Sequence, residues 1–194
     1  MQINLLFPTP VYYSIDEKDV CKRDQLREKC LEITQDEKIQ ERVNPYHRVS
    51  TSYKVIDDLH TIDAFAPLVE YIEENARQFL EKLGFPRQIF RIVRMWTNVG
   101  KKGDFVYPHT HVGEAIFSGV YYVSVDNRDG ISIHDPVDRF PPKEFNPLNL
   151  ASYSYEGIPG RLLMFRAETL HSTFPQEGEE RIIISFNLQF IDET

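Results

Sequence analysis

Two segments, Tyr107-Pro-His-Thr-His111 and Arg181-Ile-Ile-Ile-Ser-Phe-Asn-Leu-Gln-Phe190, indicate how this chain folds. The second segment is strongly apolar and has the composition of a buried strand. The first places two histidines two residues apart. Because residues i and i+2 of a strand point to the same face, His109 and His111 could direct both imidazoles at one point. We therefore predict a β-rich domain with a polar site inside it.

Two further polar residues extend this pair. His171 follows after about sixty residues, and Arg181 lies ten residues further on. Imidazole is a suitable ligand for iron, copper, nickel and zinc. An arginine in an apolar strand is costly to bury unless it is paired, and its planar guanidinium suits a carboxylate. The pattern favours a metal site beside an anion-binding arginine. The carboxylate could come from a protein Asp or Glu or from a bound cosubstrate, and the two neighbouring histidines could instead face solvent at a strand end.

From Ile89 onward the hydrophobic pattern has a period of two, with turn residues and no helix between the apolar runs. Such spacing is typical of a sandwich, jelly roll or barrel. The segment 135–159 carries five of the twelve prolines and is long for a loop, so it is expected either to be a surface excursion or to cover a substrate. Strands are predicted at 89–99, 105–111, 116–125, 131–134, 150–155, 161–165, 171–174 and 181–191.

The N-terminal half has helical patterns instead. Ser14 and Glu17 are spaced as a capping box, which predicts a helix to about Gln35, and the run 53–56 predicts a short strand. Apolar residues recur at helical spacing from 61 to 83, and Gly84 is a suitable C-cap. We expect one domain over 1–194, in which 1–88 supplies a strand and supporting helices and 89–194 forms the β core.

The overall composition narrows the function classes. The net charge is −8, which disfavours binding to a phosphate backbone. The two cysteines, Cys21 and Cys30, lie in one predicted helix and are too far apart along it to pair with each other. This usage indicates a reduced, cytoplasmic protein. No apolar stretch approaches the length of a membrane span, and no signal peptide is recognisable.

The order of these residues resembles the 2-oxoglutarate/Fe(II)-dependent oxygenases, which have H-x-(D/E), a distant His and then an Arg or Lys on a double-stranded β-helix. It is most similar to a group of short oxygenases in that superfamily, through Trp96-Thr-Asn98, His109-Thr-His111 and Ser118-Gly-Val-Tyr-Tyr122. The resemblance covers about 89–190. Further similar segments are Phe7-Pro-Thr-Pro10, Asp129-Gly-Ile-Ser-Ile-His-Asp-Pro136 and Gly160-Arg-Leu-Leu-Met-Phe165.

The resemblance implies a mainly β (α+β) fold, with a cupin-like jelly-roll core and the N-terminal helices packed outside it. It also implies an enzyme that uses Fe(II) and 2-oxoglutarate to hydroxylate its substrate, releasing succinate and CO2. That substrate would be a small molecule or an amino-acid side chain, and the exposed sheet edge could pair in a homodimer. The residues implied are His109, His111 and His171 for iron, Arg181, Ser185 and Tyr122 for 2-oxoglutarate, and Asn98 and Asn187 facing the same cavity.

One departure from the superfamily concerns His111, which stands where an Asp or Glu is usual. Three neutral imidazoles leave a divalent ion with a formal charge of +2, whereas a carboxylate would lower it to +1. Glu114 could alternatively be the carboxylate ligand, although it does not share the i, i+2 geometry of the two histidines.

Two other readings fit part of the pattern. Gly103-x5-His109-x-His111-x2-Glu114 comes near the first cupin motif, which would give a metal enzyme that does not use 2-oxoglutarate. The second cupin motif fails, because His171 lies too far beyond Pro159. The other reading is a non-catalytic scaffold, supported by the missing carboxylate and opposed by the presence of His171 and Arg181.

Overall fold

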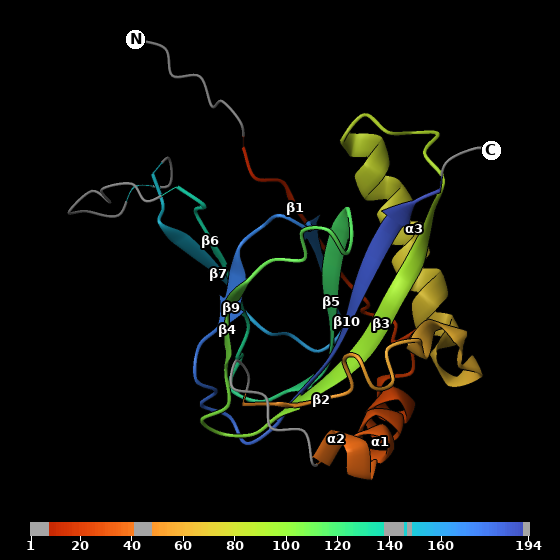
Figure 1. Cartoon of the computed structure of the whole chain (residues 1–194), viewed down its shortest axis with the longest axis vertical. Coiled ribbons are helices and arrows are strands. Elements are labelled where there is room, and N and C mark those ends of the chain that lie inside the picture. The colour runs from red at the N-terminus through yellow and green to blue at the C-terminus, as the bar shows by residue number, and fades with distance from the viewer. Residues whose placement is uncertain (1–7, 41–47, 138–145, 147–148, 192–194) are drawn as a thin grey trace.

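The computed structural model describes residues 8–40, 48–137, 146 and 149–191. Two antiparallel sheets form the body of the protein (Figure 1). The larger sheet has the spatial order β1 (Val11–Ile15), β8 (Arg161–Arg166), β5 (Phe117–Val125), β10 (Arg181–Phe190), β3 (Phe90–Gly100) and β2 (Ser50–Thr51). The smaller sheet has the order β4 (Val106–His109), β9 (His171–Thr173), β6 (Ile131–His134) and β7 (Ser152–Tyr155).

The helices cover the outer face of the larger sheet, on the side away from the smaller sheet (Figure 1). The helix α3 (Ala66–Lys82) is the longest, and two short 3-10 helices, η1 (Leu59–Thr61) and η2 (Asp63–Phe65), lead into it. The helices α1 (Arg23–Ile33) and α2 (Glu37–Gln40) lie at the bottom of the view in Figure 1, near the end of the sheet where β2 is labelled.

Strand β10 lies between two apolar cores, because its successive side chains point alternately to one face of the larger sheet and to the other. Ile182, Ile184 and Phe186 point to the helices and belong to the larger core. Arg181, Ile183 and Ser185 point to the opposite face, where they line a cavity between the sheets. A smaller apolar cluster, which includes Val120, Tyr122, Ile133, Leu163 and Phe165, fills the rest of that space. The period of two therefore gives one strand a structural face and a cavity face.

The architecture confirms the predicted mainly β fold with outer helices. The strands predicted after residue 89 are all present, with ends that differ by a few residues. The N-terminal part contributes β1 and β2, one at each edge of the larger sheet. The predicted glycine stop of this helix is also confirmed: α3 ends at Lys82, Leu83 is its C-cap residue, and Gly84 follows with a φ of 87°.

The predicted start of the first helix was wrong. Ser14 lies in β1, and α1 begins only at Arg23. The intervening turn is organised by Asp16, whose carboxylate accepts hydrogen bonds from the backbone N–H groups of Val20 (2.9 Å) and Cys21 (3.0 Å). A local side-chain to backbone contact thus replaced the expected capping box.

Two other predictions need correction. The segment 53–56 is a turn rather than a strand, and the short strand β2 lies just before it. The helix expected from residue 61 begins at Ala66, after the two 3-10 turns. Ten residues of the segment 135–159, namely 138–145, 147 and 148, lie outside the described residues, and the covering role stays a prediction.

Cys21 and Cys30 are both free and buried, and Cys21 precedes α1 rather than lying within it. Among the described residues, no helix has the length and apolar character needed to cross a membrane.

Candidate metal centre

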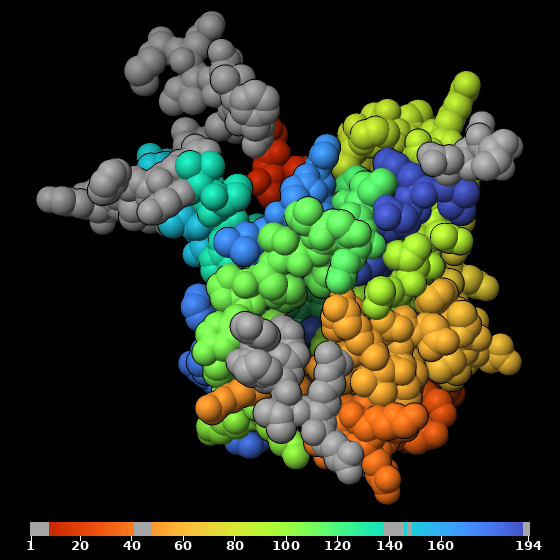
Figure 2. All heavy atoms as spheres, viewed as in Figure 1, coloured from red at the N-terminus to blue at the C-terminus, as the bar shows by residue number. Residues whose placement is uncertain are grey.

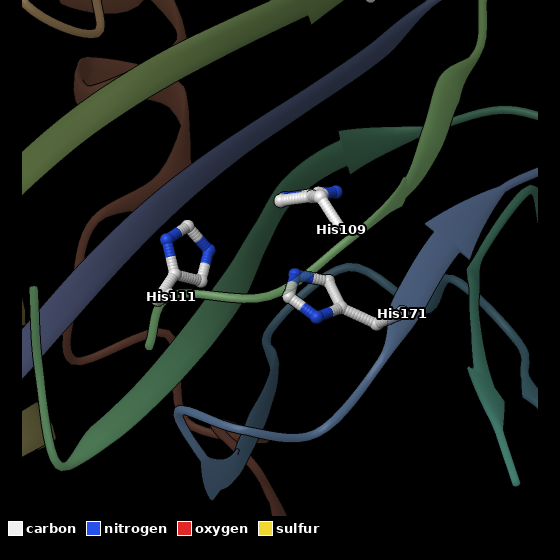
Figure 3. Close-up of side chains that lie close together, drawn as sticks. All are labelled: His109, His111 and His171. Carbon is white, nitrogen blue, oxygen red and sulfur yellow. The ribbon is translucent and has the colours of Figure 1, made fainter. Parts of the chain in front are cut away.

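Three histidines meet at one end of the cavity between the sheets (Figure 3). His109 ends β4 and His171 begins β9, and the two residues are directly paired across these strands. Their ring centroids are 4.2 Å apart, and the His111 ring lies 5.2 Å from that of His109 and 5.3 Å from that of His171. One ligand atom from each imidazole lies within 4.8 Å of the other two.

The predicted pair of histidines does not sit on one strand. Strand β4 ends at His109, and His111 follows it in a turn. The backbone N–H of His111 donates to the carbonyl oxygen of Ala167 at 2.8 Å, which ties this turn to the segment between β8 and β9. The structure therefore brings His109 and His111 together, but through a turn and a cross-strand pair rather than along one face of a single strand.

Hydrogen bonds orient two of the rings. The Nδ1 atom of His109 lies 2.9 Å from the carbonyl oxygen of Tyr107, and that of His171 lies 2.8 Å from the carbonyl oxygen of Thr169. A carbonyl oxygen can only accept, so each Nδ1 carries the proton and Nε2 carries the lone pair. Nε2 would then be the ligand atom of both residues.

Burial keeps these imidazoles neutral, which is the form that binds a metal. Burial lowers the pKa of His171 to about 3, with the neighbouring His109 adding to the effect. Burial, together with His109, likewise lowers the pKa of His111 to about 4. The pKa of His109 is also lowered, chiefly by burial. Because all three pKa values fall below the ordinary value, the three lone pairs are available at neutral pH.

Arg181 lies on the cavity wall and is only 3% exposed. Its Nη2 donates to the Oγ1 of Thr173 at 3.3 Å. Within the described part of the chain, its guanidinium has no carboxylate within ion-pair distance. Burial lowers its pKa, while the more distant charges of Asp104 and Asp129 oppose that shift. A buried cation without a close counterion is costly unless an anion binds to it.

The other predicted cavity residues divide into two groups. Tyr122, Ser185 and Asn98 line the cavity, and the Asn98 amide donates to the Oγ of Ser185 at 3.1 Å. Burial raises the pKa of Tyr122 to about 12, so its hydroxyl keeps its proton and can donate to an anion. Asn187 lies opposite Ser118, which lines the cavity. It is fully buried and accepts a hydrogen bond from the Ser118 hydroxyl at 2.8 Å, but it is not itself among the residues that line the cavity.

Glu114 is not part of the histidine cluster. One carboxylate oxygen accepts a hydrogen bond from the Tyr53 hydroxyl at 2.5 Å, and Lys54 lies 3.7 Å from the other oxygen. The same oxygen that binds Tyr53 is 3.8 Å from the Nδ1 of His111. The alternative in which Glu114 replaces a histidine as a ligand is therefore not the arrangement observed.

Sequence reasoning missed Tyr53 and Lys54, which line the mouth of the cavity with Glu114. The segment that carries them was expected to be a strand, and contacts between residues so far apart leave no signal in local spacing. In Figure 2 a recess opens between the green segment near residue 110 and the orange segment that follows residue 50. The cavity has a volume of about 290 Å³.

Residues 94–187, which carry the three histidines and Arg181, match a family model described as "Putative 2OG-Fe(II) oxygenase". The match covers 94 of the 194 residues and makes this segment similar to the 2OG-Fe(II) oxygenase family. The family uses Fe(II) and 2-oxoglutarate, and a cluster of three imidazoles is a suitable site for the metal. No curated protein has a matching sequence.

Solved structures with the same fold include a hydroxylase, a protein with bound nickel and 2-oxoglutarate, and an epimerase. A prolyl-4-hydroxylase from Pseudomonas putida is 13% identical, with a TM-score of 0.61 over 96% of this chain and 94% of that chain. HygX from Streptomyces hygroscopicus, solved with nickel and 2-oxoglutarate, is 13% identical, with a TM-score of 0.62 over 93% and 83%. The alpha ketoglutarate dependent epimerase SnoN from nogalamycin biosynthesis is 12% identical, with a TM-score of 0.68 over 96% and 79%.

At these identities the likeness establishes the fold, which is the double-stranded β-helix expected from the sequence. The family match favours a 2OG-Fe(II) oxygenase over the cupin-like enzyme and the scaffold.

Proposed function

We propose that this oxygenase hydroxylates its substrate, with Fe(II) held by His109, His111 and His171 and 2-oxoglutarate held by Arg181. The observation that carries the proposal is the buried Arg181 guanidinium, which has no carboxylate partner within ion-pair distance among the described residues and lies in the same cavity as the three imidazoles. A planar guanidinium binds a carboxylate through two parallel hydrogen bonds, so a dicarboxylic cosubstrate matches it well.

The donors of the cavity fit the two groups. The three nitrogen ligands suit iron and leave coordination positions open, and the Tyr122 and Ser185 hydroxyls could support Arg181 in binding the distal carboxylate. When bound, Fe(II) and 2-oxoglutarate supply the oxidising chemistry with O2, in which the cosubstrate is converted to succinate and CO2. The protein's own part is to hold the cosubstrate, to orient the substrate and to exclude water through the apolar wall that includes Ile131, Ile183 and Phe165.

The size of the cavity bears on the substrate. At about 290 Å³ it lies at the lower end of the range for small-molecule sites, and 2-oxoglutarate would take up part of it. We infer that the remaining space accepts a small molecule or a single side chain of a larger one. Among proteins with this fold, the prolyl-4-hydroxylase and a prolyl hydroxylase in complex with a peptide fragment illustrate the second case, and HygX with hygromycin B illustrates a small molecule.

The proposal can be tested by turnover without a known substrate. Purified protein is incubated with Fe(II), 2-oxoglutarate and O2, and succinate release is measured. Slow succinate release that is lost in H171A and reduced in R181M would support the proposal. With a true substrate added, hydroxylation would then give a product heavier by one oxygen atom. Succinate release that is equal in wild type and H171A would contradict it.

A further inference from the structure

His111 differs from the other two histidines in what lies against its Nδ1 atom. In His109 and His171, that atom faces the carbonyl oxygen of the residue two positions earlier. In His111 it faces the Oε2 of Glu114 at 3.8 Å, three residues later. This separation is an ion-pair distance rather than a hydrogen bond. An oxygen nevertheless lies beside all three Nδ1 atoms, which favours the proton there and the lone pair on Nε2.

The Glu114 carboxylate is held in this place by several groups. The Tyr53 hydroxyl donates to it, Lys54 lies close to it, and the backbone N–H of Glu114 donates to the carbonyl oxygen of His111 at 3.0 Å. A glutamate carboxyl has an ordinary pKa of about 4.3, so Glu114 is an ionised carboxylate at neutral pH.

Two aromatic residues, Tyr53 and Trp96, also connect Glu114 to His111. The Tyr53 ring packs on Trp96 with a centroid separation of 4.8 Å, and Trp96 lies 5.8 Å from the His111 ring. Tyr53 therefore connects the carboxylate of Glu114 to the indole that borders His111. The His111 ring thus has an indole beside it, tilted by 58°, and a carboxylate near its Nδ1 atom, and these two neighbours restrict the rotation of the ring, as a metal ligand requires.

The charge of a metal bound to the three histidines also favours a carboxylate near His111. Three neutral imidazoles add no charge, so a divalent ion bound to them keeps its formal charge of +2. A carboxylate near His111 offsets part of that charge in a partly buried site, where charges are poorly screened. It also makes the imidazole a stronger electron donor when its Nδ1–H faces the carboxylate.

We propose that Glu114 is a positioning residue of the metal centre: it holds the proton of His111 on Nδ1, presents Nε2 to the metal, and supplies a negative charge next to a ligand set that has none. The inference rests on the proposed binding of a metal by the three histidines. It assigns a role to the unit formed by Tyr53, Lys54 and Glu114, which the proposed reaction does not otherwise use.

The first test needs no metal. Long-range ¹H–¹⁵N correlation spectra of the metal-free protein report which nitrogen of each histidine carries the proton, and the H111A variant assigns the His111 signals. We expect His111 to be protonated on Nδ1 in the wild type and to become a mixture of both tautomers in E114Q. A wild-type His111 protonated on Nε2 would overturn the proposal.

The second test is an anaerobic Co(II) titration followed by the visible absorption of the bound ion. Loss of an outer partner of a metal-bound histidine typically weakens metal binding by about tenfold to a hundredfold, so we expect a Kd at least about ten times higher in E114Q. Y53F, which removes the hydroxyl that holds Glu114, should shift the Kd in the same direction by less. The matched control is E168Q, which removes a charge from an exposed carboxylate outside the cavity and should bind Co(II) as the wild type does.

The outcomes separate the two proposals. Wild-type affinity and an unchanged spectrum in E114Q would overturn the role of Glu114 and leave the metal site intact. A wild-type protein that binds no Co(II) would overturn the metal site and, with it, this inference.

Discussion

At the scale of single residues, the proposal assigns the binding of the cosubstrate carboxylate to Arg181. Removal of one partner of a buried, hydrogen-bonded charge pair costs about 2 kcal/mol or more, equivalent to a loss of affinity of about thirtyfold. R181M should therefore weaken 2-oxoglutarate binding to the Ni(II)-loaded protein by at least that factor in calorimetry. R181K keeps the positive charge but loses the planar guanidinium that binds a carboxylate through two hydrogen bonds. Its affinity for 2-oxoglutarate should therefore lie between those of the wild type and R181M.

The control measurement is the affinity for Ni(II), which neither R181M nor R181K should change. A methionine variant that bound 2-oxoglutarate as tightly as the wild type would show that another residue holds the carboxylate.

The residues of the site differ in how far the sequence revealed them. His109, His111, His171 and Arg181 were found because their residue types are unusual in an apolar β pattern and their order is that of a known family. Tyr53 was missed because it meets Glu114 across a separation of 61 residues, and such a contact depends on the tertiary fold alone.

At the scale of elements, the turn between β1 and α1 depends on Asp16. Its buried carboxylate accepts two backbone N–H groups and the Tyr121 hydroxyl at 3.1 Å. Each buried donor left without an acceptor costs about 1–3 kcal/mol, so D16A should lower the free energy of unfolding by at least that much. The exposed Asp24 in the first turn of α1 provides the control, and D24A should change stability by less than about 0.5 kcal/mol. Urea denaturation measures both, and equal stability of the two variants would contradict this role.

Asp16 also predicts part of the pH dependence. Burial raises its pKa, but the backbone hydrogen bonds from Cys21 and Val20 and the contact with Tyr121 lower it more, so the folded pKa is below the ordinary value. A depressed folded pKa means that this stabilisation is complete above the unfolded pKa of about 3.9 and is lost as the pH falls through the folded pKa. The stability difference between wild type and D16N should therefore shrink on acidification below about pH 4. A difference that stayed constant from neutral pH to the acid limit would contradict the assignment.

The same turn shows why sequence analysis placed the strands better than the helix start. The alternation of β10 follows from burial on two faces and is visible in the sequence. A capping box at Ser14 and an Asp turn at Asp16 are both locally reasonable, and the pairing of Ser14 with Leu162 in the sheet decided between them.

At the scale of the whole molecule, the site lies between the two sheets, because the three histidines come from β9, the end of β4 and the turn after it, whereas Arg181 lies on β10 of the larger sheet. A ligand that binds only the folded state stabilises it by about 2.7 kcal/mol at a concentration of 100 times its Kd. For a chain of this size, that corresponds to an increase in Tm of about 5–10 °C on addition of Ni(II). The H171A variant should show little of this increase, and an equal increase in H171A would place the metal elsewhere.

The fold class followed from whole-molecule patterns: the change of period near residue 89, the absence of helical spacing beyond it, and the amphipathic stripe that became α3. The packing of helices against one sheet was predicted. The positions of β1 and β2 at the two edges of the larger sheet were not, since such short strands carry too few residues to show a hydrophobic period.

The central claim is that the three histidines and Arg181 form one site for Fe(II) and 2-oxoglutarate. The most direct measurement is an anaerobic titration of the metal-free protein with Fe(II) and then 2-oxoglutarate, followed by the weak visible charge-transfer band of the chelate. The account predicts a band that requires both components, weakens in R181A and is absent in H171A. Iron binding with no spectral response to 2-oxoglutarate in the wild type would contradict it.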